Sequence, residues 1–181
     1  GKLHGFWYAF GEHDGWTPLM IAAQKSSPEV IQILLNNGAD INAVNNRQDD
    51  VESPLTIAIN NNRPDIVQLL ITCGADINTK DKKGNRPLHI AVSKNYENIY
   101  NLLIACGAEI DPRNNDGDTP LITALANDHK KIAQILLQKG ASVKNKTQKG
   151  LSPLLLAAAK GYKDIVETLI ARDADINVKN A

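Results

Sequence analysis

Five prolines recur along the chain at a nearly constant spacing. Pro18, Pro54, Pro87, Pro120 and Pro153 are separated by intervals of 36, 33, 33 and 33 residues. A fixed period in this range is typical of stacked repeats, in which each unit packs only on its neighbours. The spacing therefore predicts a repeat solenoid, whose function is expected on an exposed surface and not in a deep pocket.

Each proline lies in a motif that keeps the same phase. The motif reads Thr-Pro-Leu or Ser-Pro-Leu in four copies and Arg86-Pro87-Leu88-His89 in the third, and an alanine follows four residues after every proline. Twenty residues after each proline comes a glycine, except that Asp173 replaces it in the fifth copy. This pattern closely resembles the ankyrin repeat, whose T-P-L-H-x-A stretch is nearly complete at residues 87–91.

The resemblance covers about residues 14 to 180 and implies an all-α ankyrin-repeat solenoid, built from helix-turn-helix units with projecting β-turn or hairpin loops. We expect an N-terminal aromatic capping segment at residues 1–13 and an ankyrin repeat domain at 14–181. Its repeats are expected at about 14–46, 50–82, 83–115, 116–148 and 149–181.

The residue types predict where each helix begins and ends. Proline is tolerated in the first turn of a helix, and a preceding Ser or Thr can cap free N–H groups, so each motif is expected to open a first helix. A turn to a second helix is expected at residues whose types tolerate positive φ: Ser26, Asn62, Asn95, Asp128 and Gly161. The glycine twenty residues after the proline is expected to end the second helix in a left-handed conformation.

The two ends of the stack differ from its middle. Thr168 replaces an apolar residue of the last second helix, which predicts a polar-faced cap. At the other end, Phe6, Trp7, Tyr8, Phe10 and Trp16 supply five of the eight aromatic residues. We interpret residues 3–10 as covering the apolar edge of repeat one; the alternative is an aromatic anchor for a partner. Trp16 is the better anchor, because its turn position is expected to project outward.

The sequence lacks four common motifs for nucleotide binding, metal-dependent catalysis and thiol redox chemistry. It contains no G-x-G-x-x-G, no Walker-type loop, no H-E-x-x-H and no C-x-x-C. The four histidines are dispersed along the sequence. His89 belongs to the repeat motif and is expected to form a hydrogen bond with the backbone of a turn. We therefore expect no enzyme activity, no catalytic residue, no cofactor and no metal.

Cys73 and Cys106 occupy equivalent places in adjacent repeats, just before the helix-ending glycine. Stacked helices lie about 8–10 Å apart, farther than a disulfide allows, so we expect two free thiols and interpret them as small buried hydrophobes. Free thiols favour a reducing compartment, so the cytoplasm is the expected location. No apolar run is long enough to span a membrane, and no signal peptide is visible.

Charge is distributed unevenly, although the net charge is zero. Residues 1–79 carry a net charge of −5 and residues 80–181 a net charge of +5. The longer first interval adds three residues to an acidic turn at 47–52, whereas residues 129–163 contain eight lysines and no acid. This contrast predicts an acidic partner segment facing Lys144–Lys149; the alternative is that these charges only solvate the surface. Nucleic acid is not expected, since only Tyr162 among aromatics, and no arginine, accompanies the lysines.

The resemblance implies a protein-interaction module, acting as a scaffold, adaptor or inhibitor, that binds a protein through its concave face and turn loops. We expect it to be a monomer that binds neither nucleic acid nor membrane. The alternatives are a regulatory ankyrin domain of a larger enzyme, a secreted bacterial effector, and a self-assembling solenoid. The expected partner-binding residues are Trp16, Lys25, Arg47, Asp49, Asp50, Glu52, Asn85, Lys94, Asp118, Lys144, Lys146, Lys149, Leu151 and Lys160.

Overall fold

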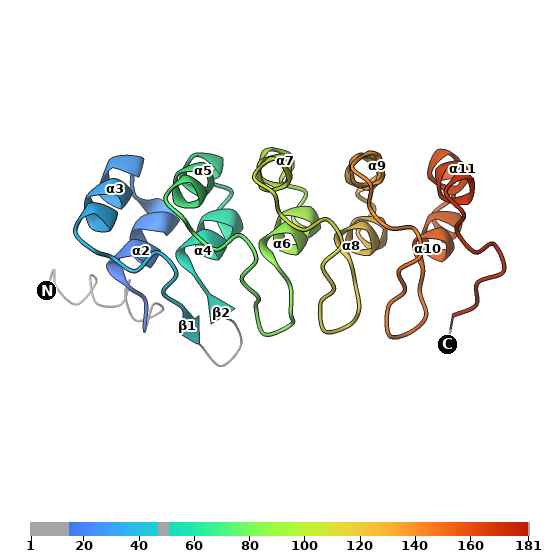
Figure 1. The fold of residues 1–181 in the computed structure, drawn as a ribbon, viewed down its shortest axis with the longest axis horizontal. Helices are drawn as coiled ribbons and strands as arrows, with labels where there is room; N and C mark the ends of the chain where they lie inside the picture. The colour runs from blue at the N-terminus through green and yellow to red at the C-terminus, as the bar shows by residue number, and fades with distance from the viewer. Residues whose placement is uncertain (1–14, 47–50, 181) are drawn as a thin grey trace, which may run out of the picture. The chain divides into compact units, whose positions relative to one another are not determined.

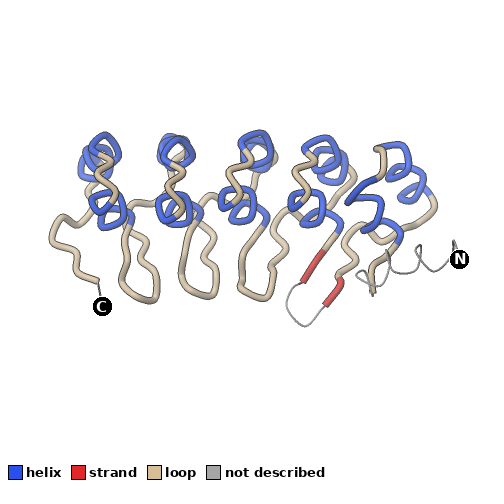
Figure 2. Tube along the Cα trace, turned by 180° about the vertical axis from the view of Figure 1, so that it is seen from behind, coloured by secondary structure: helices blue, strands red, loops and turns tan. Residues whose placement is uncertain are grey.

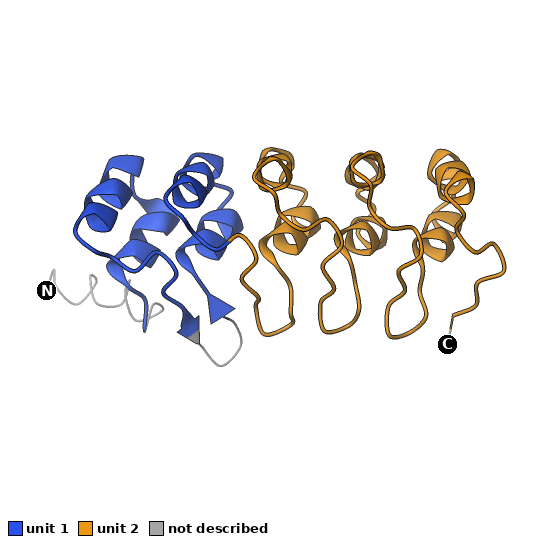
Figure 3. Cartoon of the chain, in the orientation of Figure 1, with its two compact units in different colours: residues 1–76 blue, residues 77–181 orange. Residues whose placement is uncertain are grey.

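The structure is a computed structural model that describes residues 15–46 and 51–180. These residues form ten helices and one pair of very short strands, so the fold is all-α, as the repeat pattern predicts. Figure 1 shows the helices in successive pairs, each followed by a loop. The chain divides into two compact units, residues 1–76 and 77–181, which are described separately below (Figure 3).

The first unit contains two helix pairs and the two strands. Its elements are α2 (Pro18–Lys25), α3 (Pro28–Asn36), β1 (Asn45–Asn46), β2 (Val51–Glu52), α4 (Pro54–Asn60) and α5 (Pro64–Thr72). The strands pair antiparallel, with Asn45 opposite Glu52 and Asn46 opposite Val51. They lie in the loop between α3 and α4, on the side of the helices where the loops project (Figure 2). In the longer first interval, the short β-ladder thus stands on either side of residues 47–50.

The second unit contains three helix pairs. Its elements are α6 (Pro87–Ser93), α7 (Glu97–Ala105), α8 (Pro120–Ala126), α9 (Lys130–Gln138), α10 (Pro153–Ala159) and α11 (Lys163–Ala171). Within this unit, the second helices α7, α9 and α11 lie on one side of the first helices, and the loops project from the other side (Figure 1). The loops and first helices therefore share a face that the second helices do not cover.

The first helices begin as the motif predicts. The hydroxyl oxygens of Thr17, Ser53, Thr119 and Ser152 each accept a hydrogen bond from the backbone N–H three residues later. The third copy has Arg86 at this position, and there the backbone N–H of Arg86 instead donates to Nδ1 of His89, over 3.2 Å. In this copy the cap is therefore supplied by the histidine of the motif.

The chain reverses between paired helices much as expected. Asn62, Asn95, Asp128 and Gly161 have φ between 52° and 68°. The prediction for Ser26 is wrong, because its φ is −95°. The helix α2 continues to Lys25, one residue longer than the other first helices allow, and the N–H of Ser26 bonds to the Ala22 carbonyl.

The second helices end in a left-handed residue in every repeat. The four glycines predicted for this role have φ between 84° and 95°, and Asp173 takes the same conformation with φ of 60°. The alanine that follows each of them donates to a carbonyl of the helix five residues earlier, for example Ala141 to Leu136 over 2.9 Å. This hydrogen bond satisfies a carbonyl that the helix itself leaves unpaired.

The core consists of small and aliphatic side chains from both helices of each pair. The motif leucines Leu19, Leu55, Leu88 and Leu121 are at most 1% exposed. The motif alanines, four residues after each proline, are at most 2% exposed. Such tight burial needs a small side chain at the alanine position, which explains why both residues recur with the period.

The predictions for the two cysteines, for Thr168 and for the N-terminal segment have different outcomes. Cys73 and Cys106 are free thiols, as expected, but both are exposed, so the interpretation as buried hydrophobes is wrong. Each cysteine is the C-cap of its helix, immediately before the left-handed glycine. Thr168 is exposed and donates to the Asp164 carbonyl over 2.8 Å, but Ile170 of the same helix is also exposed, so the surface of α11 is not uniformly polar. The predicted capping segment at 1–13 lies outside the described residues.

Candidate functional site

The loops of the second unit end in three closely similar turns. A backbone hydrogen bond closes each turn over four residues, from Asp81 to Asn85, from Asn114 to Asp118 and from Thr147 to Leu151. The N–H of Asn115 donates to the Lys83 carbonyl, and that of Gln148 donates to the Asp116 carbonyl, both over 2.8 Å. The three turns are therefore joined side by side through their backbones.

Amide side chains strengthen the contact between neighbouring turns. Nδ2 of Asn115 donates to the Lys82 carbonyl over 2.8 Å, and Nε2 of Gln148 donates to the Asn115 carbonyl. Gly84 allows this approach, because a Cβ atom at Gly84 would lie 2.5 Å from Oδ1 of Asn115. The turns therefore form a continuous polar surface that is held in a fixed register.

A groove lies between the last two turns and the first helices α8 and α10; we call it the Leu151 groove. It has a volume of about 320 Å³. The residues that line it are Asp116, Asp118, Ile122, Ala126, Thr147, Gln148, Lys149, Leu151 and Leu156. The helices contribute Ile122, Ala126 and Leu156, whereas the turns contribute the charged residues and Leu151. Three residues predicted from the sequence meet here: Asp118, Lys149 and Leu151.

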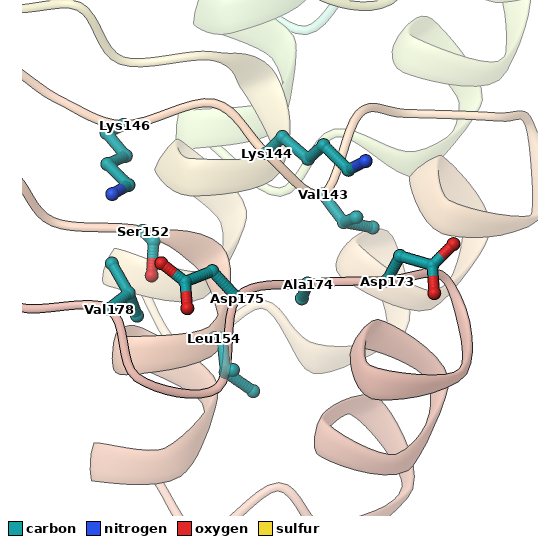
Figure 4. Close-up of a pocket in the computed structure, with 9 residues that line it drawn as sticks. All are labelled: Val143, Lys144, Lys146, Ser152, Leu154, Asp173, Ala174, Asp175 and Val178. Carbon is teal, nitrogen blue, oxygen red and sulfur yellow. The ribbon is translucent and has the colours of Figure 1, made fainter.

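A second hollow, which we call the Lys144 hollow, lies between the loop after α9 and the segment after α11. Its volume is about 370 Å³. The residues that line it are Val143, Lys144, Lys146, Ser152, Leu154, Asp173, Ala174, Asp175 and Val178. In Figure 4, Lys144 and Lys146 extend from the loop on one side, and Asp173 and Asp175 lie on the other. The hollow therefore has a basic wall, an acidic wall and apolar residues between them.

The eight lysines at 129–163 do not form one basic patch. Four of them pair with acids: Lys130 with Asp164, Lys131 with Glu97, Lys160 with Asp128, and Lys163 with Glu167. Within the described residues, Lys139, Lys144, Lys146 and Lys149 have no ion pair. Three of these four belong to the loop at 144–149, so the predicted basic segment is reduced to that loop.

The ion pairs leave a clear electrostatic signature on α9 and α11. Hydrogen bonding to Lys130 lowers the pKa of the Asp164 carboxyl. Hydrogen bonds from Lys160 and from the Tyr162 hydroxyl lower the pKa of Asp128, at distances of 2.6 Å and 2.8 Å. The ammonium of Lys130 also lies 5.6 Å from the centre of the Tyr162 ring. These lysines are held by neighbours in the fold, in contrast to Lys144 and Lys146.

Other predicted site residues of the second unit have structural contacts. Oδ1 of Asn85 accepts a hydrogen bond from Nδ2 of Asn114, and Nδ2 of Asn85 donates to Asp81, both over 2.9 Å. The side chain of Asn85 thus holds the turn together and joins it to the next turn. Lys94 is exposed at the end of α6. Lys160 is engaged with Asp128.

In the first unit, the predicted aromatic anchor contacts the acidic turn. Nε1 of Trp16 donates to Oε2 of Glu52 over 2.9 Å. Both residues are half-buried. The indole of Trp16 therefore lies against the next turn position and does not project freely outward. Lys25 is exposed in the last turn of α2. The predicted residues Arg47, Asp49 and Asp50 lie outside the described residues.

His89 forms hydrogen bonds with the backbone, as predicted. Nδ1 accepts from the Arg86 N–H, so Nε2 carries the proton and lies 3.1 Å from the Asp118 carbonyl. Burial lowers the pKa of His89, although the Asp118 carbonyl and nearby acids oppose this effect. The imidazole is thus held neutral between a helix start and the next turn.

Among the described residues, no group of three or more His, Cys, Asp or Glu side chains could hold a metal ion. No helix in the described ranges is long and apolar enough to cross a membrane.

Several residues of the groove and hollow escaped prediction. Ile122 and Ala126 form part of the Leu151 groove, and Asp175 lines the Lys144 hollow. Ala126 carried a usable signal, since the equivalent positions in the first three repeats hold Gln24, Asn60 and Ser93. Asp175 carried none, because every repeat except the fourth has an acid at its position.

Comparison with known families agrees with the geometry. The family model described as ankyrin repeats in three copies matches residues 43–114 and 88–180. The model of a single ankyrin repeat matches residues 14–46. No curated protein sequence is similar enough to the chain to count as a match.

Proposed function

Because the chain belongs to the ankyrin repeat family, whose members generally mediate contacts between proteins, we propose that it binds a protein partner. The partner contacts the turns and the first helices, and the chain acts as a monomeric scaffold, adaptor or inhibitor without catalysis of its own. The observation that carries this proposal is the Leu151 groove, where a shallow apolar floor meets a polar rim.

The floor of the groove suits an aliphatic side chain. Ile122 is only 2% exposed and provides a fixed base, while Leu151 and Leu156 are partly exposed around it. A specific protein interface buries about 800 Å² on each partner, much more than one groove can offer. We therefore assign the groove the role of an anchor point, around which the other turns make polar contacts.

The rim of the groove adds orientation. Asp116 and Asp118 stand on one turn and Lys149 on the next, so opposite charges face the same groove. Charged groups at a rim influence association rate and register more than affinity. A partner is thus placed along the turns by its own charge pattern.

We extend the partner-binding surface to other residues predicted from the sequence. In the second unit these are Lys94 and the lysines of the 144–149 loop, which suit an acidic segment of the partner. In the first unit they are Trp16, Lys25 and Glu52, together with Arg47, Asp49 and Asp50.

The exposure of Cys73 and Cys106 bears on location. Two exposed free thiols persist most readily where glutathione and thioredoxin keep cysteines reduced. We therefore assign the chain to the cytoplasm.

The proposal is tested by blocking the groove without touching the core. Ala126 is exposed at the end of α8, so Ala126→Arg fills the groove with a large side chain. Ala105 is exposed at the end of α7, a second helix, and Ala105→Arg is the matched control. Proteins captured from source cells by the unaltered chain are identified and then measured for direct binding by calorimetry.

We expect the partner to bind the unaltered chain and the Ala105→Arg variant alike, and to lose at least about ten-fold in affinity for Ala126→Arg. Equal binding of all three proteins would show that the groove takes no part in recognition. Circular dichroism of each variant confirms that it is folded.

A further inference from the structure

Side chains in the loops form hydrogen bonds to the loop of the following repeat; we call these forward links. In the first unit, Oδ1 of Asn42 accepts from the backbone N–H of Asp76 over 2.9 Å. In the second unit, both carboxylate oxygens of Asp111 accept from the N–H of Ser142, at 3.0 Å and 2.9 Å. Asn42 and Asp111 occupy the same position in their repeats. In these two repeats, an acceptor at this position thus caps the first free N–H of the next loop.

A second forward link accompanies the first in the third repeat. The guanidinium of Arg113 donates to the carbonyl of Lys146, in the loop of the fourth repeat. Asp111 and Arg113 together therefore tie one loop to the next through an acceptor and a donor. Burial raises the pKa of the Asp111 carboxyl, as expected for a group that lies between two loops.

The fourth repeat lacks both links. Lys144 stands at the position of Asn42 and Asp111, and Lys146 stands at that of Arg113. An ammonium carries donors only, so Lys144 cannot accept a hydrogen bond from the backbone N–H of Asp175. Asp175 is the residue equivalent to Asp76 and Ser142. Within the described part of the chain, neither ammonium makes a hydrogen bond or ion pair. The N–H of Asp175 therefore lacks the side-chain cap that Asp76 and Ser142 have.

The Lys144 hollow occupies the place of these missing links. Its volume of about 370 Å³ is enough for a carboxylate side chain with its methylene groups. Val143, Leu154 and Val178 supply the apolar surface between the charged walls. Figure 4 shows Lys144 and Lys146 on the loop that borders the hollow.

The acidic wall does not satisfy the lysines. Asp175 is already used in its own turn, where Oδ1 accepts from the N–H of Asn177 over 3.0 Å. No ion pair within 4.0 Å joins Lys144 or Lys146 to Asp173 or Asp175, all four of which the structure describes. The hollow thus combines an uncapped N–H donor with two ammonium groups that lack a counterion.

We propose that the Lys144 hollow receives a glutamate side chain from an acidic segment of the partner. Its carboxylate accepts from the Asp175 N–H, as the Asp111 carboxylate does from Ser142, and pairs with Lys144 and Lys146. Its methylene groups contact Val143 and Leu154. This inference rests on the proposed protein-binding function and assigns one element of recognition to it: the partner supplies the link that the fourth repeat lacks.

The inference is tested with an acetylated, amidated hexaglutamate peptide as the probe. The peptide is added to the full chain at low salt while backbone amide signals are followed by NMR. We expect the Asp175 amide to shift to saturation, and hexaglutamine to leave it unmoved. No saturable Asp175 shift with hexaglutamate would overturn the inference, and so would an equal shift with inorganic phosphate at the same ionic strength.

Three variants separate a specific site from general charge attraction. Lys144→Asn introduces an internal acceptor for the Asp175 N–H, Lys144→Met removes the charge alone, and Lys139→Asn removes an equally unpaired charge at the end of α9. We expect Lys144→Asn to weaken peptide binding by about ten-fold, Lys144→Met by less, and Lys139→Asn by less than about two-fold. Equal weakening by all three would overturn the inference.

Failure of this test leaves the protein-binding proposal intact. That proposal depends on the Ala126→Arg and Ala105→Arg pair in the Leu151 groove, whose residues the peptide experiment does not involve.

Discussion

The indole N–H of Trp16 donates a 2.9 Å hydrogen bond to Oε2 of Glu52. The two residues hold the same turn position in consecutive repeats, and Glu52 also faces Asn45 across the β1–β2 ladder. Trp16, which the sequence predicts to be an anchor for a partner, is therefore hydrogen-bonded to the last residue of the acidic turn at 47–52. This hydrogen bond therefore joins the turn positions of the first two repeats.

Removing the acceptor is predicted to destabilise the first unit. A hydrogen bond to a charged group is worth about 1.5–3 kcal/mol, and partial exposure of this pair reduces that value to about 1–2 kcal/mol. We expect Glu52→Ala to lower the free energy of unfolding by that amount and Glu52→Gln by less, as measured by urea denaturation. If Glu52→Ala is as destabilising in a Trp16→Phe background as alone, the hydrogen bond contributes nothing.

The buried His89 predicts a loss of stability in mild acid. Because burial lowers its pKa below 6.5, the unfolded chain binds a proton at a pH where the folded chain does not. Its contribution is therefore complete above about pH 6.5 and is lost as the pH falls from there toward the folded pKa, with a slope of at most about 1.4 kcal/mol per pH unit. Urea denaturation at a series of pH values measures this slope.

The second repeat offers the matched control for His89. There Thr56 holds the equivalent position, and its hydroxyl accepts from the Ser53 N–H over 2.8 Å. We expect His89→Thr to keep the cap on the Arg86 N–H but to lose the bond to the Asp118 carbonyl. The variant should be less stable at neutral pH and lack the acid-dependent loss; an unchanged pH profile would assign that loss to other groups.

The contact between neighbouring turns depends on the absence of a side chain at Gly84. A Cβ atom there would lie 2.5 Å from Oδ1 and 2.9 Å from the backbone nitrogen of Asn115. At Gly107, which also has positive φ, a Cβ atom would meet nothing within 4 Å. We expect Gly107→Ala to cost about 1–2 kcal/mol from backbone strain alone, and Gly84→Ala to cost at least about 1 kcal/mol more. Thermal unfolding of both variants compares these costs, and equal costs would mean that the turns shift freely.

The fold could be predicted because its causes are local and repeated. The Ser or Thr before four of the five motif prolines caps a first helix, and a glycine such as Gly140 ends a second helix. The failures arose where one copy departs from the others. Ser26 was assigned a positive φ by analogy, but α2 extends one residue further. The exposure of Cys73 depends on which side of a helix end faces the core, and residue type alone does not determine this.

The candidate site was only partly predictable, because pairing depends on contacts between repeats. The run of eight lysines suggested one basic patch, yet Lys131 pairs with Glu97, 34 residues away. Within the described residues, the three lysines of the 144–149 loop form no ion pair: Lys144, Lys146 and Lys149. The departure of Lys144 from the Asp or Asn of other repeats was visible in the sequence. That it removes an acceptor for the Asp175 N–H could be seen only in three dimensions.

The missing link at Lys144 predicts that the fourth and fifth repeats are coupled less strongly than they could be. Lys144→Asn places at this position the residue that, as Asn42, accepts from the Asp76 N–H in the first unit. A new neutral hydrogen bond is worth about 1 kcal/mol, so we expect the free energy of unfolding to rise by about that amount. We also expect slower hydrogen exchange at the Asp175 amide, which the new acceptor protects.

Lys139→Asn is the control for this stabilisation, because it removes the same charge from a residue that does not occupy a forward-link position. It should change neither the unfolding free energy nor exchange at Asp175. Should Lys144→Asn behave in the same way, an asparagine at this position does not reach the next loop, and the Lys144 hollow owes its opening to another cause. If it stabilises the chain while weakening hexaglutamate binding, then one position trades internal coupling for an external ligand, as expected where repeat regularity yields to function.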